Sequence, residues 1–313
     1  MTDHIFIVNP AAGKADRTEP ITNAVKQLSV DGNVEVYTTV AKGDGARFVC
    51  ERLQNAVNPV RLYACGGDGT FFGVLNGILK AGKLGSPDVS IGAIPTGSGN
   101  DFIKSFNIEA SRFRSIRDMS EGSTMPIDVI KITDASGEST VCANIASAGF
   151  DADVCRNMES LRRVPLVSGS NAYRLSVAKT MLSKLGHKFT VLGDGKKVGE
   201  NLKTDDYLFV LAANGLYYGG GYKPSPESVL DDGLLNLVLI EKVSRLDFPR
   251  FIGDYRKGEY FDKMEGRMVH TPVKNMQILC DNPIDMNLDG EVLAFKNPYI
   301  EIVPHGMNFI LPA

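Results

Sequence analysis

The sequence has no tryptophan, and its five cysteines form no C-x-x-C pair. Most of these cysteines lie in apolar runs, where a thiol behaves as a small hydrophobic group. An odd number of scattered cysteines argues against a disulfide framework and against a zinc site. The four histidines are equally dispersed and show no metal-ligand spacing, so we expect them to be structural or surface residues: His4, His187, His270 and His305.

No apolar run is long enough to span a bilayer. The first residues, Met1–Ile5, show neither the basic start nor the apolar core of a signal peptide. A formal net charge of -3 gives no general attraction to nucleic acid or to anionic membranes. We therefore expect a cytoplasmic protein that binds no nucleic acid and whose membrane contacts are local.

Several familiar catalytic motifs are also missing. The sequence contains no Gly-x-x-x-x-Gly-Lys-Ser/Thr phosphate loop and no serine–histidine–acid signature. No Gly-x-Gly-x-x-Gly follows the first apolar run, Ile5–Val8, which disfavours a dinucleotide-dependent dehydrogenase. With 43% hydrophobic and 23% charged residues in 313 positions, the chain is otherwise an ordinary globular protein of one large domain or two.

The most informative stretch that is present is Gly66-Gly67-Asp68-Gly69-Thr70. It separates an apolar run at 60–64 from a segment with helical spacing at 71–80. Glycines at a strand-to-helix turn let the backbone approach a ligand, and a helix start attracts phosphate. Asp68 within this turn suits a metal ion or a hydroxyl group. The alternative is a plain tight turn, because glycine-rich motifs often occur without a function.

The first part of the chain alternates strands with helices. Strands are expected at 5–8, 34–39, 60–64 and 89–95, and helices at 19–28, 46–53 and 71–80. This alternation predicts a parallel, doubly wound sheet, which binds its ligands at the carboxyl ends of the strands. The polar loops after these strands should all open at that edge: 9–14, 38–45, 66–70 and 97–101.

Short strands dominate after residue 127, which predicts a second, mostly antiparallel β domain with its boundary there. The expected strands are 129–132, 139–146, 188–192, 207–213, 233–240, 276–280, 284–288, 299–303 and 309–311. The expected helices of this domain are 172–185, 246–255 and 260–264.

Four stretches of the second domain could carry chemistry, each with a plainer alternative. Asp289-Gly290-Glu291 is either a hairpin turn or, if it faces the Asp68 loop, a pair of carboxylates acting as base and metal partner. Asp231-Asp232-Gly233 is either a solvated turn or a site for a hard cation. The segment 215–222 either lines an apolar substrate or packs as a bulge. The segment 156–174 shows little periodicity, and its mixture of arginine, leucine and valine suits a membrane-facing edge or a solvated surface.

In order and spacing, these motifs resemble those of the diacylglycerol kinase catalytic-domain family. The likeness is strongest to its soluble bacterial lipid kinases, which are relatives of sphingosine and ceramide kinases. The residues that match are Asn9-Pro10, Gly66–Thr70, Gly97–Phe102, Asp232-Gly233 and Asp289–Glu291.

The resemblance implies a phosphofructokinase-like α/β domain at 1–127, joined by the final segment 304–313, and a lipid-binding β-sandwich at 128–303. The active site would lie in the cleft between them. The cofactors would be ATP and Mg²⁺, and the acceptor a lipid alcohol, foremost diacylglycerol, which would give phosphatidic acid. The protein would touch the inner face of the membrane transiently, and a homodimer is compatible with the family.

The resemblance also implies residue roles. Glu291 would be the general base, while Asp68, Asp101 and Asp289 would organise Mg²⁺ and the phosphates. Asp232, with the carbonyl groups of Val229 and Leu234, would hold a structural Mg²⁺. The residues expected to contact ATP are Asn9, Pro10, Ala11, Ala12, Gly13, Thr39, Gly66, Gly67, Asp68, Gly69, Thr70, Phe71, Phe72, Gly97, Ser98, Asn100 and Asp101.

Two positions depart from the family pattern. Ser98 stands where many relatives have threonine, which keeps the hydroxyl group. Phe72-Gly73 replaces the usual Asn-Glu, so only backbone contacts are expected there. Two other functions stay open: a kinase of a soluble substrate such as NAD, and a non-catalytic lipid-binding regulator. The Asp-Asp-Gly and Asp-Gly-Glu motifs favour the lipid kinases, and the retained acidic residues argue against a regulator.

Overall fold

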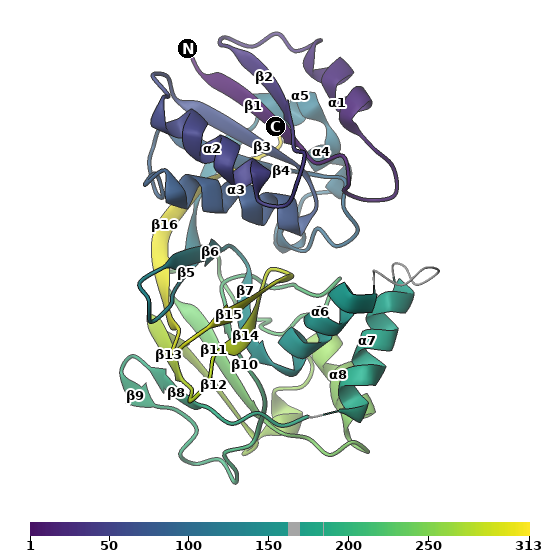
Figure 1. The fold of residues 1–313 in the computed structure, drawn as a ribbon, viewed down its shortest axis with the longest axis vertical. Coiled ribbons are helices and arrows are strands. Elements are labelled where there is room, and N and C mark those ends of the chain that lie inside the picture. Colours follow the sequence, from purple (N-terminus) through teal and green to yellow (C-terminus); the bar gives the residue numbers. More distant parts are fainter. Residues whose placement is uncertain (162–169, 184) are drawn as a thin grey trace. The chain divides into compact units, whose positions relative to one another are not determined.

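The computed structural model describes residues 1–161, 170–183 and 185–313. Its chain divides into two compact units (Figure 1). The first unit comprises Met1–Val129, Leu230–Asp232 and Val303–Ala313. The second comprises Ile130–Val229 and Gly233–Ile302. Two strands, β5 (Ser123–Thr133) and β16 (Tyr299–Leu311), begin in one unit and end in the other.

The first unit is a parallel sheet with helices on both faces, which confirms the predicted doubly wound fold (Figure 1). Its strand order is β2-β1-β3-β4, and the last part of β16 adds a parallel strand beside β4. Ile5–Val8 are at most 1% exposed, as expected for a strand covered on both faces. The strands are β1 (Asp3–Val8), β2 (Val34–Thr38), β3 (Val60–Gly66) and β4 (Val89–Pro95). The helices are α1 (Thr18–Val25), α2 (Asp44–Gln54), α3 (Asp68–Lys80), η1 (Phe102–Ser105), α4 (Ala110–Arg114) and α5 (Ile116–Glu121).

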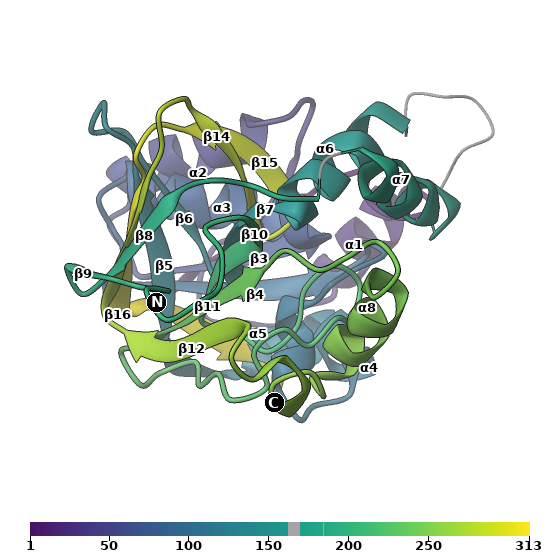
Figure 2. The same cartoon turned by 90° about the horizontal axis from the view of Figure 1, so that it is seen from below.

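The second unit contains a six-stranded antiparallel sheet in the order β12-β11-β10-β7-β14-β15. A further layer pairs β13 with β8 and with the start of β16, and β5 with β6. Its helices gather on one flank of the unit in both views (Figures 1 and 2). The strands are β6 (Ser139–Cys142), β7 (Ile145–Gly149), β8 (Thr190–Gly193), β9 (Lys196–Lys197), β10 (Tyr207–Ala213), β11 (Leu235–Glu241), β12 (Met268–Val273), β13 (Asn275–Leu279), β14 (Ile284–Leu288) and β15 (Glu291–Phe295). The helices are α6 (Phe150–Leu161), α7 (Ser170–Leu182), α8 (Phe248–Lys257) and η2 (Asp262–Met264).

The strand predicted at 139–146 is wrong, because the chain leaves one strand and enters another within it. β6 ends at Cys142 and pairs with β5, whereas β7 begins at Ile145 and joins the six-stranded sheet. Between them, the backbone N–H groups of Ala143 and Asn144 donate to the carboxylate of Asp289. The Asp289 side chain, which is distant in sequence, thus accepts from backbone N–H groups that a continuous strand would have paired with a neighbouring strand.

The segment at 156–174 was expected to show little periodicity, yet α6 covers its beginning. Phe150 and Val154, one helical turn apart, are buried against the core of the second unit. Arg162, Arg163, Val164, Leu166 and Val167 lie outside the described residues. Strands β12 and β15 were not predicted, and the two strands expected at 299–303 and 309–311 form the single strand β16.

Candidate active site

The four polar loops of the first unit lie at one edge of the sheet, because β1, β2, β3 and β4 are all parallel. Backbone and side-chain hydrogen bonds join the loops to one another. Asn9 Nδ2 donates to Thr70 Oγ1 at 3.0 Å, which links the loop after β1 to the loop after β3. The Gly66 carbonyl oxygen accepts from the N–H groups of Thr96 at 2.8 Å and Gly97 at 3.2 Å, which links the loops after β3 and β4.

Glycine allows these loops to approach backbone against backbone. Gly13 has φ of +79°, and a Cβ atom there would lie 2.1 Å from the carbonyl oxygen of Thr96. A Cβ atom on Gly97 would lie 2.5 Å from the Cα atom of Gly67. The glycines of the sequence motif are therefore needed for loop packing as well as for any ligand.

Asp68 fixes the loop after β4 on the start of helix α3. Its two carboxylate oxygens accept from the backbone N–H groups of Asn100 at 2.7 Å and Asp101 at 2.8 Å. Burial, and then the nearby negative charge of Asp101, raise the pKa of Asp68. Asp101 in turn pairs with Lys104, whose Nζ lies 2.6 Å from Asp101 Oδ1. Two acidic groups and one cation thus meet beside the N-terminus of α3, which itself favours an anion.

Two of the residues expected to contact ATP have covered side chains: Phe71 is buried and Phe72 is half-buried. Phe71 is 5% exposed, and its ring stacks on Phe102 with centroids 5.1 Å apart. Phe72 is half-buried, whereas Ser98 and Ala11 are exposed in their loops. Any contact of Phe71 with a ligand at this edge therefore falls to its backbone.

Sequence reasoning missed Asp128, which is fully buried in the first unit. Its Oδ1 accepts from the N–H group of His305 at 2.7 Å, and its own N–H group donates to the Leu230 carbonyl oxygen at 2.8 Å. Asp128 thus holds Leu230–Asp232 and the end of the chain against the first unit. The only sequence signal was the change of pattern at Pro126-Ile127-Asp128.

In the second unit, Asp289 and Gly290 form the turn between β14 and β15. Asp289 has φ of +51° and Gly290 has φ of +97°, as a tight hairpin turn requires. The carboxylate of Asp289 accepts from the N–H groups of Ala143 and Ile145, both at 2.8 Å. Glu291 follows as the first residue of β15, half-buried and opposite Leu288.

Asn287 supports this turn from the neighbouring strand. Its Oδ1 accepts from the Gly290 N–H group at 2.8 Å, and its Nδ2 lies 3.5 Å from Asp151 Oδ2. Asp151, at the start of α6, also accepts from the hydroxyl of Ser147, and burial raises the pKa of Asp151. Sequence reasoning missed Asp151 and Ser147, because nothing in their immediate sequence links them to the turn.

The residues predicted for a structural metal ion are divided between the units. Asp232 belongs to the first unit, whereas Val229 and Leu234 belong to the second. Asp231, Asp232 and Val229 are exposed. Within residues 1–161, 170–183 and 185–313, no group of three or more His, Cys, Asp or Glu side chains could hold a metal ion.

Tyr218 of the tyrosine-rich segment 215–222 is packed, whereas Gly219 and Gly220 are exposed. Tyr218 is 8% exposed within the core of the second unit, and its hydroxyl lies 2.7 Å from that of Tyr255. Arg156 on α6 pairs with Asp285 on β14, and the arginines at 162 and 163 lie outside the described residues. Over the part of the chain that is described, no helix has the length and apolar character to cross a membrane.

Comparison with known proteins places this arrangement in a family. Residues 3–132 match the model of the diacylglycerol kinase catalytic domain. Residues 144–311 match the model of the YegS C-terminal NAD kinase beta sandwich-like domain. The chain belongs to the diacylglycerol kinase catalytic-domain family. This membership confirms the resemblance inferred from the motifs, including the pairing of an α/β domain with a β-sandwich.

Relatives in the family cover nearly the whole chain. A protein of Xanthomonas oryzae pv. oryzae (strain MAFF 311018), named "probable lipid kinase YegS-like", is 28% identical over 96% of this chain and 94% of its own. A protein of the same name from Yersinia enterocolitica is 27% identical over 100% of this chain and 98% of its own. A crystal structure of a diacylglycerol kinase from Bacillus anthracis str. Sterne shares the fold, with a TM-score of 0.65, 20% identity and coverage of 98% and 96%.

Proposed function

We propose that the protein is an ATP- and Mg²⁺-dependent lipid kinase that transfers the γ-phosphoryl group of ATP to a lipid hydroxyl, with diacylglycerol as the first candidate acceptor. The observation that supports this most is the Gly66–Thr70 loop, which the Asp68 carboxylate ties to the loop after β4 at the start of α3. The family and the names of its relatives support the lipid as acceptor.

The first unit would bind ATP through the backbone of its loops. Phosphoryl transfer needs in-line positioning and neutralisation of charge more than covalent help. The hydrogen bonds among Asn9, Thr70, Gly66 and Gly97 fix the loops before a ligand arrives, so little reorganisation is needed. Thr39 would complete the set from the loop after β2, where its N–H group donates to the Val8 carbonyl oxygen at 2.9 Å.

The donor set at this edge fits Mg²⁺. Magnesium in kinases is usually held by one or two carboxylates together with substrate phosphates. Asp68 and Asp101 provide two carboxylates beside the proposed phosphate site. When bound, the ion would be held by Asp68 and Asp101 and would supply positive charge that neutralises the phosphates.

Glu291 would act as the general base of the second unit. Its carboxylate takes the proton from the lipid hydroxyl, the hydroxyl oxygen forms a bond to the γ-phosphorus, and the bond to the leaving ADP oxygen breaks. Asp289 would be a positioning residue, because its carboxylate is engaged by the backbone of Ala143–Ile145. Asn287 would hold Gly290 from the other side of the same turn.

The test is phosphate transfer from labelled ATP to a panel of lipids, with NAD as a soluble competitor acceptor. We expect Glu291→Gln to lose at least about 100-fold in kcat, because the proton acceptor is gone. Its thermal unfolding should match that of the natural protein, since Glu291 is only half-buried. Full activity of this variant would refute the role of Glu291. Phosphorylation of NAD in preference to every lipid would refute the lipid acceptor.

A further inference from the structure

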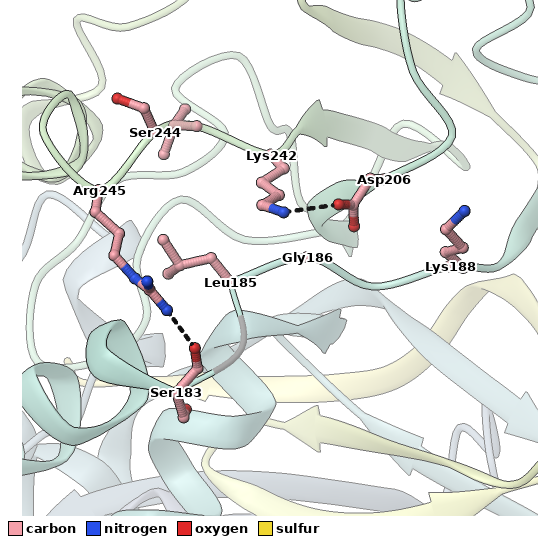
Figure 3. A pocket seen from close by; sticks show the side chains of 9 residues that line it. Ser183, Leu185, Gly186, Lys188, Asp206, Lys242, Ser244 and Arg245 are labelled. Atoms are coloured by element: carbon pink, nitrogen blue, oxygen red, sulfur yellow. Dashed lines mark hydrogen bonds and ion pairs between the residues drawn. The ribbon is translucent and has the colours of Figure 1, made fainter.

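A cavity of the second unit, separate from the residues discussed so far, has a volume of about 480 Å³ (Figure 3). It lies between the end of α7 and the segment after β11. Its lining side chains include three cations and one carboxylate: Lys188, Lys242, Arg245 and Asp206. Lys188 Nζ also lies 3.4 Å from Asp205 Oδ1, so three cations face two carboxylates here. This local excess of positive charge contrasts with the net charge of -3 of the whole chain.

The cations of this cavity are held in place by the protein. Lys242 Nζ lies 2.9 Å from Asp206 Oδ2, as Figure 3 shows. Gly186 allows Asp206 to lie there, because a Cβ atom on Gly186 would be 1.9 Å from Asp206 Oδ1. Arg245 donates to the carbonyl oxygens of Met181 at 3.1 Å and Ser183 at 2.7 Å, at the C-terminal end of α7. These carbonyl groups accept hydrogen bonds from Arg245 but carry only partial negative charge, so the guanidinium group keeps most of its positive charge.

Large apolar side chains stand exposed beside these cations. Leu246 follows Arg245 and is 92% exposed, and Leu182 at the end of α7 is 75% exposed. Leu175, seven residues before Leu182 and thus on the same face of α7, is 49% exposed. Val177 and Met181, on the other face, pack against the core of the unit. Helix α7 therefore carries more apolar surface than its packing uses.

We propose that the cavity and these leucines, Leu175, Leu182 and Leu246, form the surface by which the protein docks on an anionic phospholipid membrane. The leucines would enter the interface, and the cavity would receive a phospholipid headgroup phosphate beside Lys242 and Arg245. Exposed leucine next to lysine and arginine is the combination that binds anionic bilayers, because apolar burial and charge attraction act together. A cavity of this size accommodates a headgroup. The proposal rests on the proposed function, since an enzyme that acts on a lipid has to reach a bilayer.

The test is sedimentation of the full chain, without ATP, with phosphatidylglycerol vesicles and with phosphatidylcholine vesicles. We expect binding to phosphatidylglycerol that weakens as salt rises, and weak binding to phosphatidylcholine. Leu246→Asp and Leu182→Asp should each weaken this binding about tenfold, because a leucine is withdrawn from the interface. Lys188→Ala, which removes a cation that is 72% exposed, should weaken it about fivefold.

The matched control is Val57→Asp, which places the same charge at a 95% exposed apolar position of the first unit and should leave binding unchanged. Equal binding by all variants, or no binding by the natural chain, would overturn the proposal. If soluble glycerol phosphate competed with the vesicles, and the same substitutions weakened its binding, the cavity would be a site for a small anion. That result would overturn the proposed membrane surface. The sedimentation assay contains no ATP, so its result does not depend on kinase activity. If the natural chain lacked kinase activity but the variants still weakened vesicle binding, the proposed function would be refuted and the docking surface would be supported.

Discussion

One buried carboxylate, Asp68, ties together two loops and carries an unfavourable charge. Two backbone N–H groups stabilise that charge, but burial and Asp101 act against it and raise the pKa of Asp68. Because the folded pKa lies above the unfolded one, the stability from this group is present below the unfolded pKa and is lost as pH rises through the folded pKa. When Asp68 is ionised, the protein thus keeps a charge that its fold does not favour, which is typical of a functional residue.

Asp68→Asn is therefore expected to separate activity from stability. Kinase activity should fall about 100-fold, because a charge that organises metal and phosphate is removed. The melting temperature at pH 7 should stay level or rise, because the removal of a charge that burial and Asp101 disfavour offsets the loss of one of the two backbone hydrogen bonds. Asparagine has a single acceptor oxygen, whereas the two N–H groups bond to different oxygens of Asp68, so it can accept from the Asn100 or the Asp101 N–H group but not from both in this geometry. The difference in melting temperature between this variant and the natural protein should shrink as pH falls toward about 4, where a free aspartate protonates.

Asp88→Asn is the control for this variant, because Asp88 is an exposed carboxylate of the same unit. It should change neither activity nor melting temperature. An Asp68→Asn protein with a much lower melting temperature at pH 7 would show that the loops need the charge for folding, against the sign argued above.

Residues that belong to a local motif could be predicted from the sequence, and isolated ones could not. Asn9, Gly66–Thr70 and Gly97–Asp101 lie together in the first unit because parallel strands bring their carboxyl ends to one edge. Asp128 and Asp151 have no such motif around them. Asp128 is bonded to His305 and Asp151 to Asn287, each more than a hundred residues away in the chain, and the Ser147 hydroxyl near Asp151 forms no recognisable motif with it.

At the scale of elements, the strands and helices of the first unit from β1 to β4 follow from their apolar spacing, whereas η1, α4 and α5 were not predicted. The strand at 139–146 could not be read correctly, because its break depends on the Asp289 carboxylate from another hairpin. The Phe150–Leu161 helix was missed although Phe150 and Val154 are spaced one turn apart. There the local signal was present, and the two acidic residues between them, Asp151 and Asp153, obscured it.

Helix α3 offers a direct test of element packing, because two of its glycines differ in their surroundings. A Cβ atom on Gly77 would lie 2.7 Å from Val49 Cβ and 2.8 Å from the Ala46 carbonyl oxygen, both on α2. A Cβ atom on Gly73 would meet nothing within 4 Å. Gly77→Ala should lower the free energy of unfolding by about 1–3 kcal/mol through overpacking. Gly73→Ala should raise it by about 0.5–1 kcal/mol, since alanine restricts the unfolded chain.

Urea unfolding of the two variants measures this difference, and each serves as the control of the other. If both substitutions changed the free energy of unfolding by the same amount, helix propensity and not the contact between α2 and α3 would govern this position.

At the scale of the whole molecule, the sequence predicted two domains but not how the chain passes between them. Leu230–Asp232 belongs to the first unit although its neighbours on both sides belong to the second. The Asp128 N–H group donates to the Leu230 carbonyl oxygen and so attaches Leu230–Asp232 to the first unit. A boundary drawn from composition cannot locate three residues that depend on one distant hydrogen bond.

The two units should also respond to different ligands, and hydrogen exchange of the full chain can follow both at once. A non-hydrolysable ATP analogue with Mg²⁺ should slow exchange at 9–14, 66–72 and 96–101, where loop backbone would bind phosphate. Phosphatidylglycerol vesicles should instead slow exchange at 175–183 and 242–246, where the exposed leucines and Arg245 lie. Vesicles of phosphatidylcholine are the control for the charge of the headgroup. If the nucleotide protected 242–246 and left the glycine loops unchanged, the cavity of the second unit and not the edge of the parallel sheet would be the phosphate site.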